Sequence, residues 1–262
     1  MQMNKQTALI TGASSGIGAV YADRLAARGY NLILVARRAE RLQKLADELA
    51  QKYGANVQVC AADLAQENGQ AAVAEIIENT SDLTLLVNCA GLGALGFAAN
   101  VAWADVDGLI KVNVQALTRL SLTAAKRFIA EKRGNIVNIG SIIAQMPVAG
   151  ASAYSASKAY VLNFTRALHA ELAEVGAGAQ AVMPSPVKSE FFGDKAAPFP
   201  EALFMTAETL VDTALAALDQ QEWVCYPNLQ DIADWQQLEA ARGKFVQGVT
   251  QTGKPADRYQ TK

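Results

Sequence analysis

A tyrosine and a lysine four residues apart, Tyr154 and Lys158, could transfer a proton if both lie on a helix. Residues at this spacing share one helix face, which brings the ammonium close to the phenol. Lowering the pKa of a phenol from about 10 to about 7 requires roughly 4 kcal/mol, and one ammonium about 4 Å away supplies about that much at an effective dielectric near 20. The pair is therefore a candidate general acid/base, with the hydroxyl of Ser141 available to hold a substrate oxygen. Taken alone, such a pair is more often an ordinary surface pair, so the rest of the chain has to decide.

The elements that must position these residues follow from an alternation of short apolar runs and longer helical patterns. Runs that are apolar throughout are typical of strands buried on both faces, as in a parallel sheet covered by helices. Alternation from end to end predicts an α/β fold, a doubly wound seven-stranded parallel sheet with helices on both faces, in one domain spanning residues 1–262. The predicted strands are 8–11, 32–36, 57–61, 83–88, 135–140, 179–183 and 223–226, and the predicted helices are 16–28, 39–52, 69–79, 108–132, 153–175 and 206–219.

Two segments interrupt this alternation. The connection at 184–205 holds four of the seven prolines and four of the eight phenylalanines, and a loop of this length in a compact domain is usually functional or disordered. We predict that it forms an apolar lid, with a mobile surface excursion as the alternative. The C-terminal extension, about 228–262, is predicted to hold a helix near 229–242 that closes the pocket or an oligomer, followed by a loose tail.

The first predicted strand runs into Thr11-Gly-Ala-Ser-Ser-Gly16-Ile-Gly18, and a helix follows. Glycines at a strand-to-helix turn let a pyrophosphate approach the backbone at a helix N-terminus. A lone glycine motif is weak evidence, but this one has the required strand–turn–helix context. The segment therefore predicts a site for the phosphates of a dinucleotide.

The second predicted strand ends in Ala36, and Arg37 and Arg38 follow. NAD-binding sites usually carry an acid here that bonds the ribose hydroxyls, whereas arginine suits a 2′-phosphate. We therefore expect NADP(H) in preference to NAD(H), the alternative being that both arginines simply open a solvated helix. Asp63, after the third strand, could cap the following helix or bond the adenine amino group.

The composition excludes several classes of protein. A net charge of −2 argues against a nucleic-acid binder, which needs a basic surface. The three cysteines have no CxxC pair, and His169 is the only histidine, so neither a metal cluster nor a histidine-based triad is expected. No apolar run reaches the roughly 20 residues that span a bilayer, and no signal-peptide pattern opens the chain. We expect a cytoplasmic protein with no membrane or nucleic-acid partner.

The ordered set of motifs resembles the short-chain dehydrogenase/reductase superfamily, in its single-domain, Rossmann-like branch of about 250 residues. The motifs that carry the resemblance are the glycine turn, Asn88-Cys-Ala-Gly91, Asn113, Ser141 and Tyr154-x-x-x-Lys158.

The resemblance implies a role for each matching position. Tyr154 would be the acid/base, Lys158 would lower its pKa and bind the nicotinamide ribose, and Ser141 would hold the substrate oxygen. An oxidised, cationic nicotinamide would lower the pKa of Tyr154 further. Asn113 would anchor a water that links the lysine to solvent, and Asn88 would be structural. The implied cofactor residues are Gly12, Ser14, Ser15, Gly16, Ile17, Gly18, Arg37, Arg38, Asp63, Leu64, Asn88, Ala90, Gly91, Tyr154, Lys158, Pro184, Val187 and Ser189.

Two positions depart from the family pattern. Cys89 replaces a common asparagine, and Ser185-Pro186 stands where the family often has a glycine after the proline. Ser185 lacks the freedom of glycine at positive φ, which puts the cofactor geometry at the nicotinamide end in doubt. The proton-transfer residues are not affected.

The expected activity is NADPH-dependent reduction of a ketone or aldehyde by hydride transfer, which reversed would oxidise the alcohol. The alternatives are an NAD-dependent alcohol dehydrogenase of the same family and a non-catalytic nucleotide sensor on the same fold. The largely apolar lining favours an apolar or neutral substrate. The expected substrate-binding residues are Ser141, Ile143, Gln145, Tyr154 and Phe191. The long helices at 108–132 and 153–175 would build a homodimer or homotetramer, although their apolarity could equally reflect packing on the sheet.

Overall fold

The computed structural model describes residues 6–192 and 200–259. The chain divides into two compact units, Met1–Pro227 and Asn228–Lys262. The second unit covers the range that the sequence sets apart as an extension.

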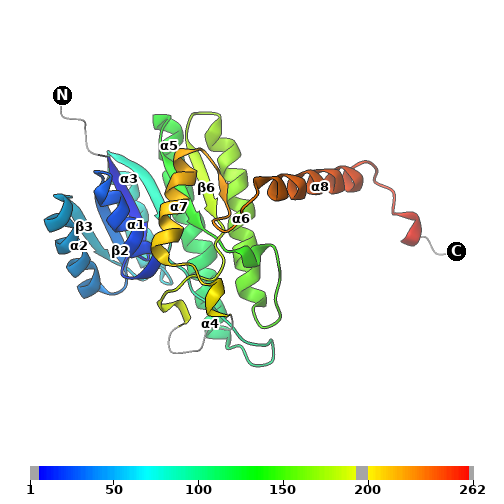
Figure 1. Cartoon of the computed structure of the whole chain (residues 1–262), viewed down its shortest axis with the longest axis horizontal. Coiled ribbons are helices and arrows are strands. Elements are labelled where there is room, and N and C mark those ends of the chain that lie inside the picture. The colour runs from blue at the N-terminus through cyan, green and yellow to red at the C-terminus, as the bar shows by residue number, and fades with distance from the viewer. Residues whose placement is uncertain (1–5, 193–199, 260–262) are drawn as a thin grey trace. The chain divides into compact units, whose positions relative to one another are not determined.

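The first unit is built on one sheet of seven parallel strands in the order β3-β2-β1-β4-β5-β6-β7 (Figure 1). The predicted fold class is confirmed, and each strand lies within a residue or two of its expected place. Both faces of the central strands are buried, which is why their sequences are apolar throughout. The strands are β1 Thr7–Thr11, β2 Asn31–Ala36, β3 Val57–Ala61, β4 Leu83–Asn88, β5 Asn135–Ile139, β6 Gly178–Val182 and β7 Val224–Cys225.

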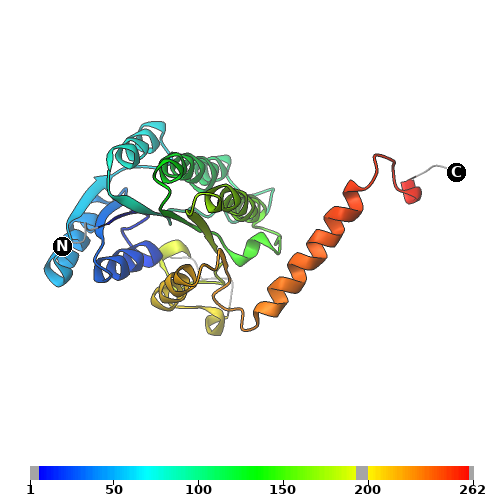
Figure 2. The same ribbon diagram turned by 90° about the horizontal axis from the view of Figure 1, so that it is seen from above.

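Helices cover both faces of this sheet, as Figure 2 shows from above. Helices α1 Gly16–Ala27, α2 Ala39–Tyr53 and α7 Ala207–Asp219 pack with one face into a first core cluster. On the other face, α3 Glu67–Asn79, α5 Leu117–Glu131 and α6 Ser152–Ala173 enclose a second cluster. The chain runs outward from β1 to β3 and then returns to β4 beside β1. Ligands of open α/β sheets bind at such a reversal, outside the carboxyl ends of the strands.

The helix expected at 108–132 begins earlier and is interrupted. Helix α4, Trp103–Ile110, continues through a π-helical turn, η1 Lys111–Ala116, into α5. The early start is hidden in the sequence because the first turn of α4 is mostly solvent-exposed, with Trp103 73% exposed. A π turn inside a helix often marks a functional site.

Short elements follow β5 and β6. A 3-10 turn, η2 Ile142–Ala144, follows β5, and two more, η3 Glu190–Phe192 and η4 Glu201–Leu203, belong to the predicted lid. An isolated bridge between Val187 and Met205 joins the two ends of this connection. Of the predicted lid, residues 193–199 lie outside the described residues.

The second unit consists of helix α8, Ile232–Thr250, and a 3-10 turn, η5 Asp257–Tyr259. The side chain of Asp231 accepts a hydrogen bond from the amide of Ala233 at 2.8 Å and caps the start of α8. The helix extends eight residues beyond the predicted end at 242, because Gly243 is tolerated within it. No helix in the described ranges is long and apolar enough to cross a bilayer.

Candidate active site

Tyr154 and Lys158 lie in the first two turns of α6, so the predicted helical pair exists. Lys158 is only 7% exposed, and its Nζ donates a hydrogen bond to the carbonyl of Ile139 at 2.8 Å. The same nitrogen lies 5.7 Å from the centre of the Tyr154 ring. Ser141 follows β5, and its Oγ accepts a hydrogen bond from the amide of Ile143 at 3.3 Å. The structure therefore brings the three residues of the predicted proton-transfer set to the end of β5.

The electrostatics of this set differ from the expectation. Burial raises the pKa of Tyr154 to about 12, and a hydrogen bond with Ser141 only partly opposes that rise. Burial also lowers the pKa of Lys158 to about 8, partly offset by the nearby Cys89 thiol. The expectation that Lys158 brings the phenol to about 7 is wrong for this structure, because removal from water outweighs the attraction of one ammonium. Tyr154 is therefore a protonated phenol at neutral pH.

Asn113 lies in the π turn and is buried. Its Oδ1 accepts from the amide of Leu92 at 2.8 Å, and its Nδ2 donates to the carbonyl of Leu92 at 2.9 Å. The Nδ2 also lies 3.2 Å from Ser157 Oγ on α6. Asn113 thus ties the loop after β4 to the helix that carries the catalytic pair, and the predicted water relay remains a prediction.

Buried polar side chains hold the ends of the central strands together. Thr11 Oγ1, at the end of β1, accepts from the amides of Cys89 and Ala90 at 3.0 Å each. Behind them, Asn88 Nδ2 donates to Asn138 Oδ1 at 2.9 Å, and Asn138 Nδ2 donates to Thr165 Oγ1 on α6 at 2.9 Å. This places Asn88 in a structural position, as the resemblance implied.

The glycine turn after β1 is shaped by close backbone approach. Gly12 has a φ of +69°, and a Cβ there would lie 2.9 Å from the backbone of Ala90. A Cβ on Gly18 would collide with the carbonyl of Gly12. Ser15 precedes helix α1 without a capping hydrogen bond from its side chain, and the first turn of α1 holds no acidic residue. The unpaired first-turn amides of a helix suit an anion.

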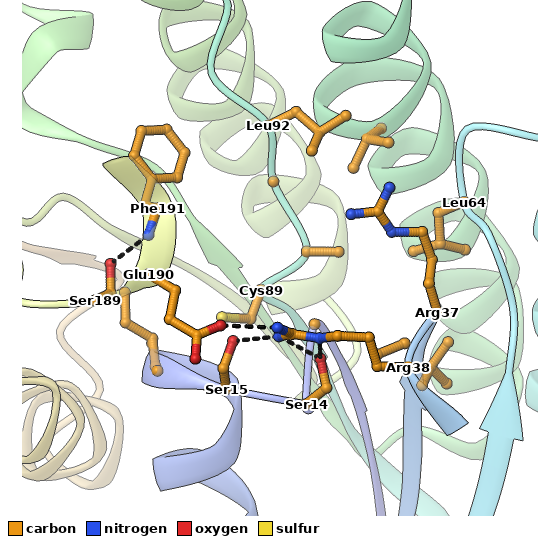
Figure 3. Close-up of a pocket in the computed structure, with 18 of the residues that line it drawn as sticks. Ser14, Ser15, Arg37, Arg38, Leu64, Cys89, Leu92, Ser189, Glu190 and Phe191 are labelled. Atoms are coloured by element: carbon orange, nitrogen blue, oxygen red, sulfur yellow. Dashed lines mark hydrogen bonds and ion pairs between the residues drawn. The ribbon is translucent and has the colours of Figure 1, made fainter. Parts of the chain in front are cut away.

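A cavity of about 440 Å³ opens at this edge of the sheet (Figure 3). Most of the predicted cofactor residues line it, together with Val35, Ala36, Cys89, Leu92 and Glu190. The predicted residues that line it are Gly12, Ser14, Ser15, Gly16, Ile17, Arg37, Arg38, Asp63, Leu64, Ala90, Gly91, Ser189 and Phe191. Six predicted cofactor residues are not among those that line it: Gly18, Asn88, Tyr154, Lys158, Pro184 and Val187.

The two arginines after β2 point to different parts of the cavity (Figure 3). Arg38 donates to Ser14 Oγ at 2.9 Å and to Ser15 Oγ at 2.7 Å. It also forms an ion pair with Glu190 at 2.8 Å, and Arg41 binds the same carboxylate at 2.8 Å. These arginines lower the pKa of Glu190 to about 2. No residue in the described part of the chain forms a hydrogen bond or ion pair with Arg37.

Asp63 and Ser189 each accept a hydrogen bond from a nearby backbone amide, whereas Arg38 bonds to other side chains. Asp63 Oδ1 accepts from the amide of Ala65 at 3.0 Å, which shapes the turn before α3 rather than capping the helix itself. Ser189 Oγ accepts from the amide of Phe191 at 3.3 Å, and both residues line the cavity.

Of the predicted substrate residues Phe191, Ile143 and Gln145, Phe191 alone is among the residues that line the cavity. The Phe191 ring lies 5.5 Å from the Tyr154 ring, and its Cζ is 2.9 Å from where a Cβ on Gly93 would stand. Gln145 Nε2 donates to the hydroxyl of Tyr226 at 2.8 Å. Phe191 therefore sits beside the phenol, whereas the described contact of Gln145 is directed to the end of the sheet.

The cavity fits a nicotinamide dinucleotide. Gly12 allows the turn to pack closely against the backbone of Ala90, and Gly91 lies beside Asn113 and Lys158, 3.9 Å from Lys158 Nζ when measured from the position a Cβ would take. The uncapped start of α1 suits the pyrophosphate. Arg37, which has no hydrogen-bond or ion-pair partner among the described residues, adds a positive charge to the lining of the same cavity. No group of three or more His, Cys, Asp or Glu in the described ranges could hold a metal ion.

The roles of several residues of the site were not predicted from the sequence. Thr11 belonged to the glycine motif but received no role of its own, although its position at the end of β1 signals contact with the next strand. Glu190 and Arg41 lie about 150 residues apart in the chain, so only the tertiary fold pairs them. Cys89 lines the cavity, and its thiol lies near Lys158.

Comparison with known proteins agrees with this geometry. The family model for short chain dehydrogenase matches residues 6–198. Sulfoacetaldehyde reductase 2 of Chromohalobacter salexigens is 36% identical over 83% of this chain and 86% of its own length. A short-chain dehydrogenase from Sphingobium yanoikuyae in complex with NADPH superposes with a TM-score of 0.93 at 39% identity, over 97% of this chain and 100% of that chain. The bulky-bulky ketone specific alcohol dehydrogenase from Comamonas testosteroni superposes with a TM-score of 0.91 at 37% identity, over 99% and 100%. The chain therefore belongs to the short-chain dehydrogenase/reductase superfamily and is an NAD(P)-dependent oxidoreductase that acts on CH–OH or C=O groups.

Proposed function

We propose that this protein is an NADPH-dependent reductase of bulky, neutral ketones or aldehydes, with Tyr154 as its acid/base. The observation that carries the proposal is the position of Tyr154, a protonated phenol beside Ser141 at the end of β5, with the buried ammonium of Lys158 behind its ring. A phenol that keeps its proton at neutral pH is suited to give it to a developing alkoxide.

Each residue of the site has its own role in the proposed reaction. NADPH supplies the hydride when it is bound. Ser141 Oγ holds the carbonyl oxygen, and Tyr154 donates its proton to that oxygen as negative charge develops on it. Lys158 then stabilises the phenolate, since a charge of opposite sign favours the ionised form. Asn113 positions the loop and helix that carry these groups.

The preference for NADPH is supported by the side chains at the end of β2. Ala36 offers no carboxylate for the ribose hydroxyls, and Arg37 is an unpaired cation in the wall of the cavity. The Sphingobium neighbour is described as a complex with NADPH, which agrees with this preference. Arg37 would form charge-assisted hydrogen bonds with the 2′-phosphate.

The preference for a bulky, neutral substrate is supported by the apolar side chains near Tyr154. Phe191 packs beside the phenol, and the exposed side chains of Met146 and Val148 lie in the loop that follows η2. The Comamonas relative is named for bulky-bulky ketones, whereas the Chromohalobacter relative is named for a small sulfonated aldehyde. A sulfonate requires a cationic partner, and no arginine lies among the residues expected to bind the substrate.

The test is a panel of substrates followed by the loss of NADPH absorbance. An aryl alkyl ketone, a diaryl ketone, a small aliphatic aldehyde and sulfoacetaldehyde are each offered with NADPH and with NADH. We expect the highest kcat/KM with a bulky ketone and NADPH. Reduction of sulfoacetaldehyde alone would contradict the proposed substrate class, and equal efficiency with NADH would contradict the proposed cofactor.

Tyr154→Phe tests the role of the phenol in the same assay. We expect kcat to fall by about 10²–10⁴, the usual contribution of a general acid, with NADPH affinity nearly unchanged. The matched control is Tyr160→Phe on the same helix, whose hydroxyl lies 2.7 Å from Thr118 Oγ1 at the surface. Retained turnover in Tyr154→Phe would show that another group donates the proton.

A further inference from the structure

Helix α8 carries a stripe of large apolar side chains along one face, interrupted in the middle by Glu239 and Arg242. None of the 19 residues of α8 is buried. The large apolar side chains of the helix are nonetheless numerous, and Phe245 is 68% exposed. Most helix stability in proteins comes from packing of an amphipathic face, and the interior Gly243 and Gly248 weaken α8 further. The stripe therefore requires a partner.

The residues of this face follow a seven-residue repeat, with three a positions and three d positions along α8. In heptad notation, Ile232, Glu239 and Val246 occupy the a positions, and Trp235, Arg242 and Val249 occupy the d positions. The g positions hold Leu238 and Phe245. Apolar a and d residues with this period are the pattern of two helices that supercoil around each other. The eight residues fall within a single arc of the helix surface.

Two copies of α8 with this pattern match each other when they run antiparallel. With the centre between Ala240 and Ala241, Ile232 faces Val249 of the other copy, and Trp235 faces Val246. Each of these contacts occurs twice, as two-fold symmetry requires. The g residues Leu238 and Phe245 then lie along the same flank of the pair. Antiparallel pairing thus matches every apolar layer with an apolar layer.

The charges in the middle of the stripe select this direction. Within one helix, Arg242 binds Glu239 at 3.2 Å and lies 5.9 Å from the Trp235 ring centre. In the antiparallel pair, Glu239 of each copy faces Arg242 of the other. In a parallel pair, Glu239 would face Glu239 and Arg242 would face Arg242, and like charges at such an interface are unfavourable. A polar layer inside a coiled coil commonly sets register and partner in this way.

We propose that α8 is an assembly arm that pairs antiparallel with α8 of a second copy of this chain, about a two-fold axis between Ala240 and Ala241. Fully covered aromatic side chains bury about 150–250 Å² each. Two copies contribute four such side chains, Trp235 and Phe245 of each, and the aliphatic residues add to them. Trp235 is already half-buried in the single chain, so the pairing buries an area on the order of the roughly 1,000 Å² that a specific contact needs. The residues that line the cavity all belong to the first unit, so the pairing of the arm and the proposed reductase activity can be tested independently.

The central ion pairs provide the first test, by light scattering of the purified full chain. Arg242→Glu places two carboxylates opposite each other, and Glu239→Arg places two guanidinium groups opposite each other. We expect each variant alone to have half the assembly mass of the wild type. Lys244→Glu, the same charge change on the opposite face of α8, should leave the mass unchanged.

Mixing the two variants separates pairing from helix stability. An equimolar mixture of Glu239→Arg and Arg242→Glu restores opposite charges across the interface, although each helix keeps its own like-charged pair. We expect the wild-type mass to return on mixing. An unchanged mass for both single variants, or no recovery on mixing, would overturn the proposal.

Cysteine cross-linking tests the direction of the helices. Ile232→Cys/Val249→Cys should form a disulfide-linked dimer under oxidation, because these positions face each other across the pair. Within one helix they are about 25 Å apart, so no bond can form inside a chain. Trp235→Cys alone should not cross-link, since its two copies lie about 16 Å apart along the pair. Cross-linking at Trp235→Cys instead of the double variant would establish a parallel pair and overturn the antiparallel one.

Discussion

The shifted pKa values of Tyr154 and Lys158 have one physical cause, which is the removal of both groups from water at the end of β5. Burial keeps the phenol protonated, with a pKa of about 12, and weakens the ammonium, with a pKa of about 8. Each shift opposes charge formation in the resting site. The ionised form of Tyr154 is therefore favoured only when Lys158 is charged at the same time or when a cationic nicotinamide lies beside the phenol.

Arg37 is predicted to distinguish the two cofactors. Because it has no partner in the described part of the chain, its charge is available to a 2′-phosphate. Arg37→Ala should lower kcat/KM for NADPH by about 10–100-fold, since a hydrogen bond to a charged group is worth about 1.5–3 kcal/mol. Efficiency with NADH should not fall. Arg28→Ala, which removes an arginine paired with Asp219 instead, is the control; equal losses with both cofactors would contradict the assignment.

Glu190 is predicted to oppose NADPH binding. Its carboxylate holds Arg38 and Arg41 and adds negative charge to the wall that would face the 2′-phosphate. Glu190→Gln should tighten NADPH binding about two- to fivefold, because an exposed charge acts only weakly through solvent, and leave NADH binding unchanged. Fluorescence titration measures both dissociation constants. Glu201→Gln, which removes the partner of Lys188, is the matched control; weaker NADPH binding in Glu190→Gln would show that the carboxylate supports the site.

At the scale of elements, the site depends on how the carboxyl ends of the strands are joined. Strands β1 and β4 are neighbours in the sheet but 70 residues apart in the chain, and Thr11 connects them by accepting two amides of the segment after β4. The π turn makes a similar connection, because Asn113 forms hydrogen bonds with Leu92 in the loop after β4 and with Ser157 on α6. These side chains position the reacting groups without touching them.

Thr11→Val tests this connection with almost no change in shape. The valine cannot accept the amides of Cys89 and Ala90, and a buried amide left unpaired costs about 1–3 kcal/mol. We expect the free energy of unfolding to fall by that amount in urea titration, with a rise in KM for the cofactor. Thr11→Ser retains the hydroxyl and should keep most of the stability. Equal losses in the two variants would assign the effect to the lost methyl group instead.

At the scale of the whole molecule, two surfaces are available for assembly. The stripe on α8 is one, and the exposed side chains Leu122 and Ile129 of α5 with Tyr160 of α6 form the other. The long helices α5 and α6 were expected to build a dimer or tetramer, and this interface remains a prediction. If both surfaces pair, through two-fold axes that cross at right angles, the chain closes into a tetramer.

The buried Lys158 is predicted to make the stability of the protein depend on pH. Its pKa is 10.5 when exposed and about 8 in the folded chain, so the unfolded chain binds more protons between these values. Stability contributed by this group therefore rises with pH from about 8 to 10.5, by about 3 kcal/mol in all. Lys158→Met removes that dependence. We expect the stability of the variant relative to the wild type to fall by about 3 kcal/mol over this range.

Urea unfolding at several pH values measures the difference. Ionisable groups that do not interact with Lys158 are common to both proteins, so their titration cancels. Lys126→Met, on the exposed side of α5, should reproduce the wild-type profile. A constant difference between Lys158→Met and the wild type would show that the ammonium is not desolvated by the fold.

The sequence alone determined the α/β fold, the glycine turn and the place of Tyr154 and Lys158 on one helix face, because each depends on local spacing. Apolar runs define buried strands, and four residues on a helix define a shared face whatever the surroundings. Only the tertiary structure decided that burial raises the pKa of Tyr154, that Glu190 meets Arg38 and Arg41, and that α8 carries an uncovered stripe. Desolvation and long-range ion pairs depend on which distant segments pack together, and the order of residues along the chain does not specify that packing locally.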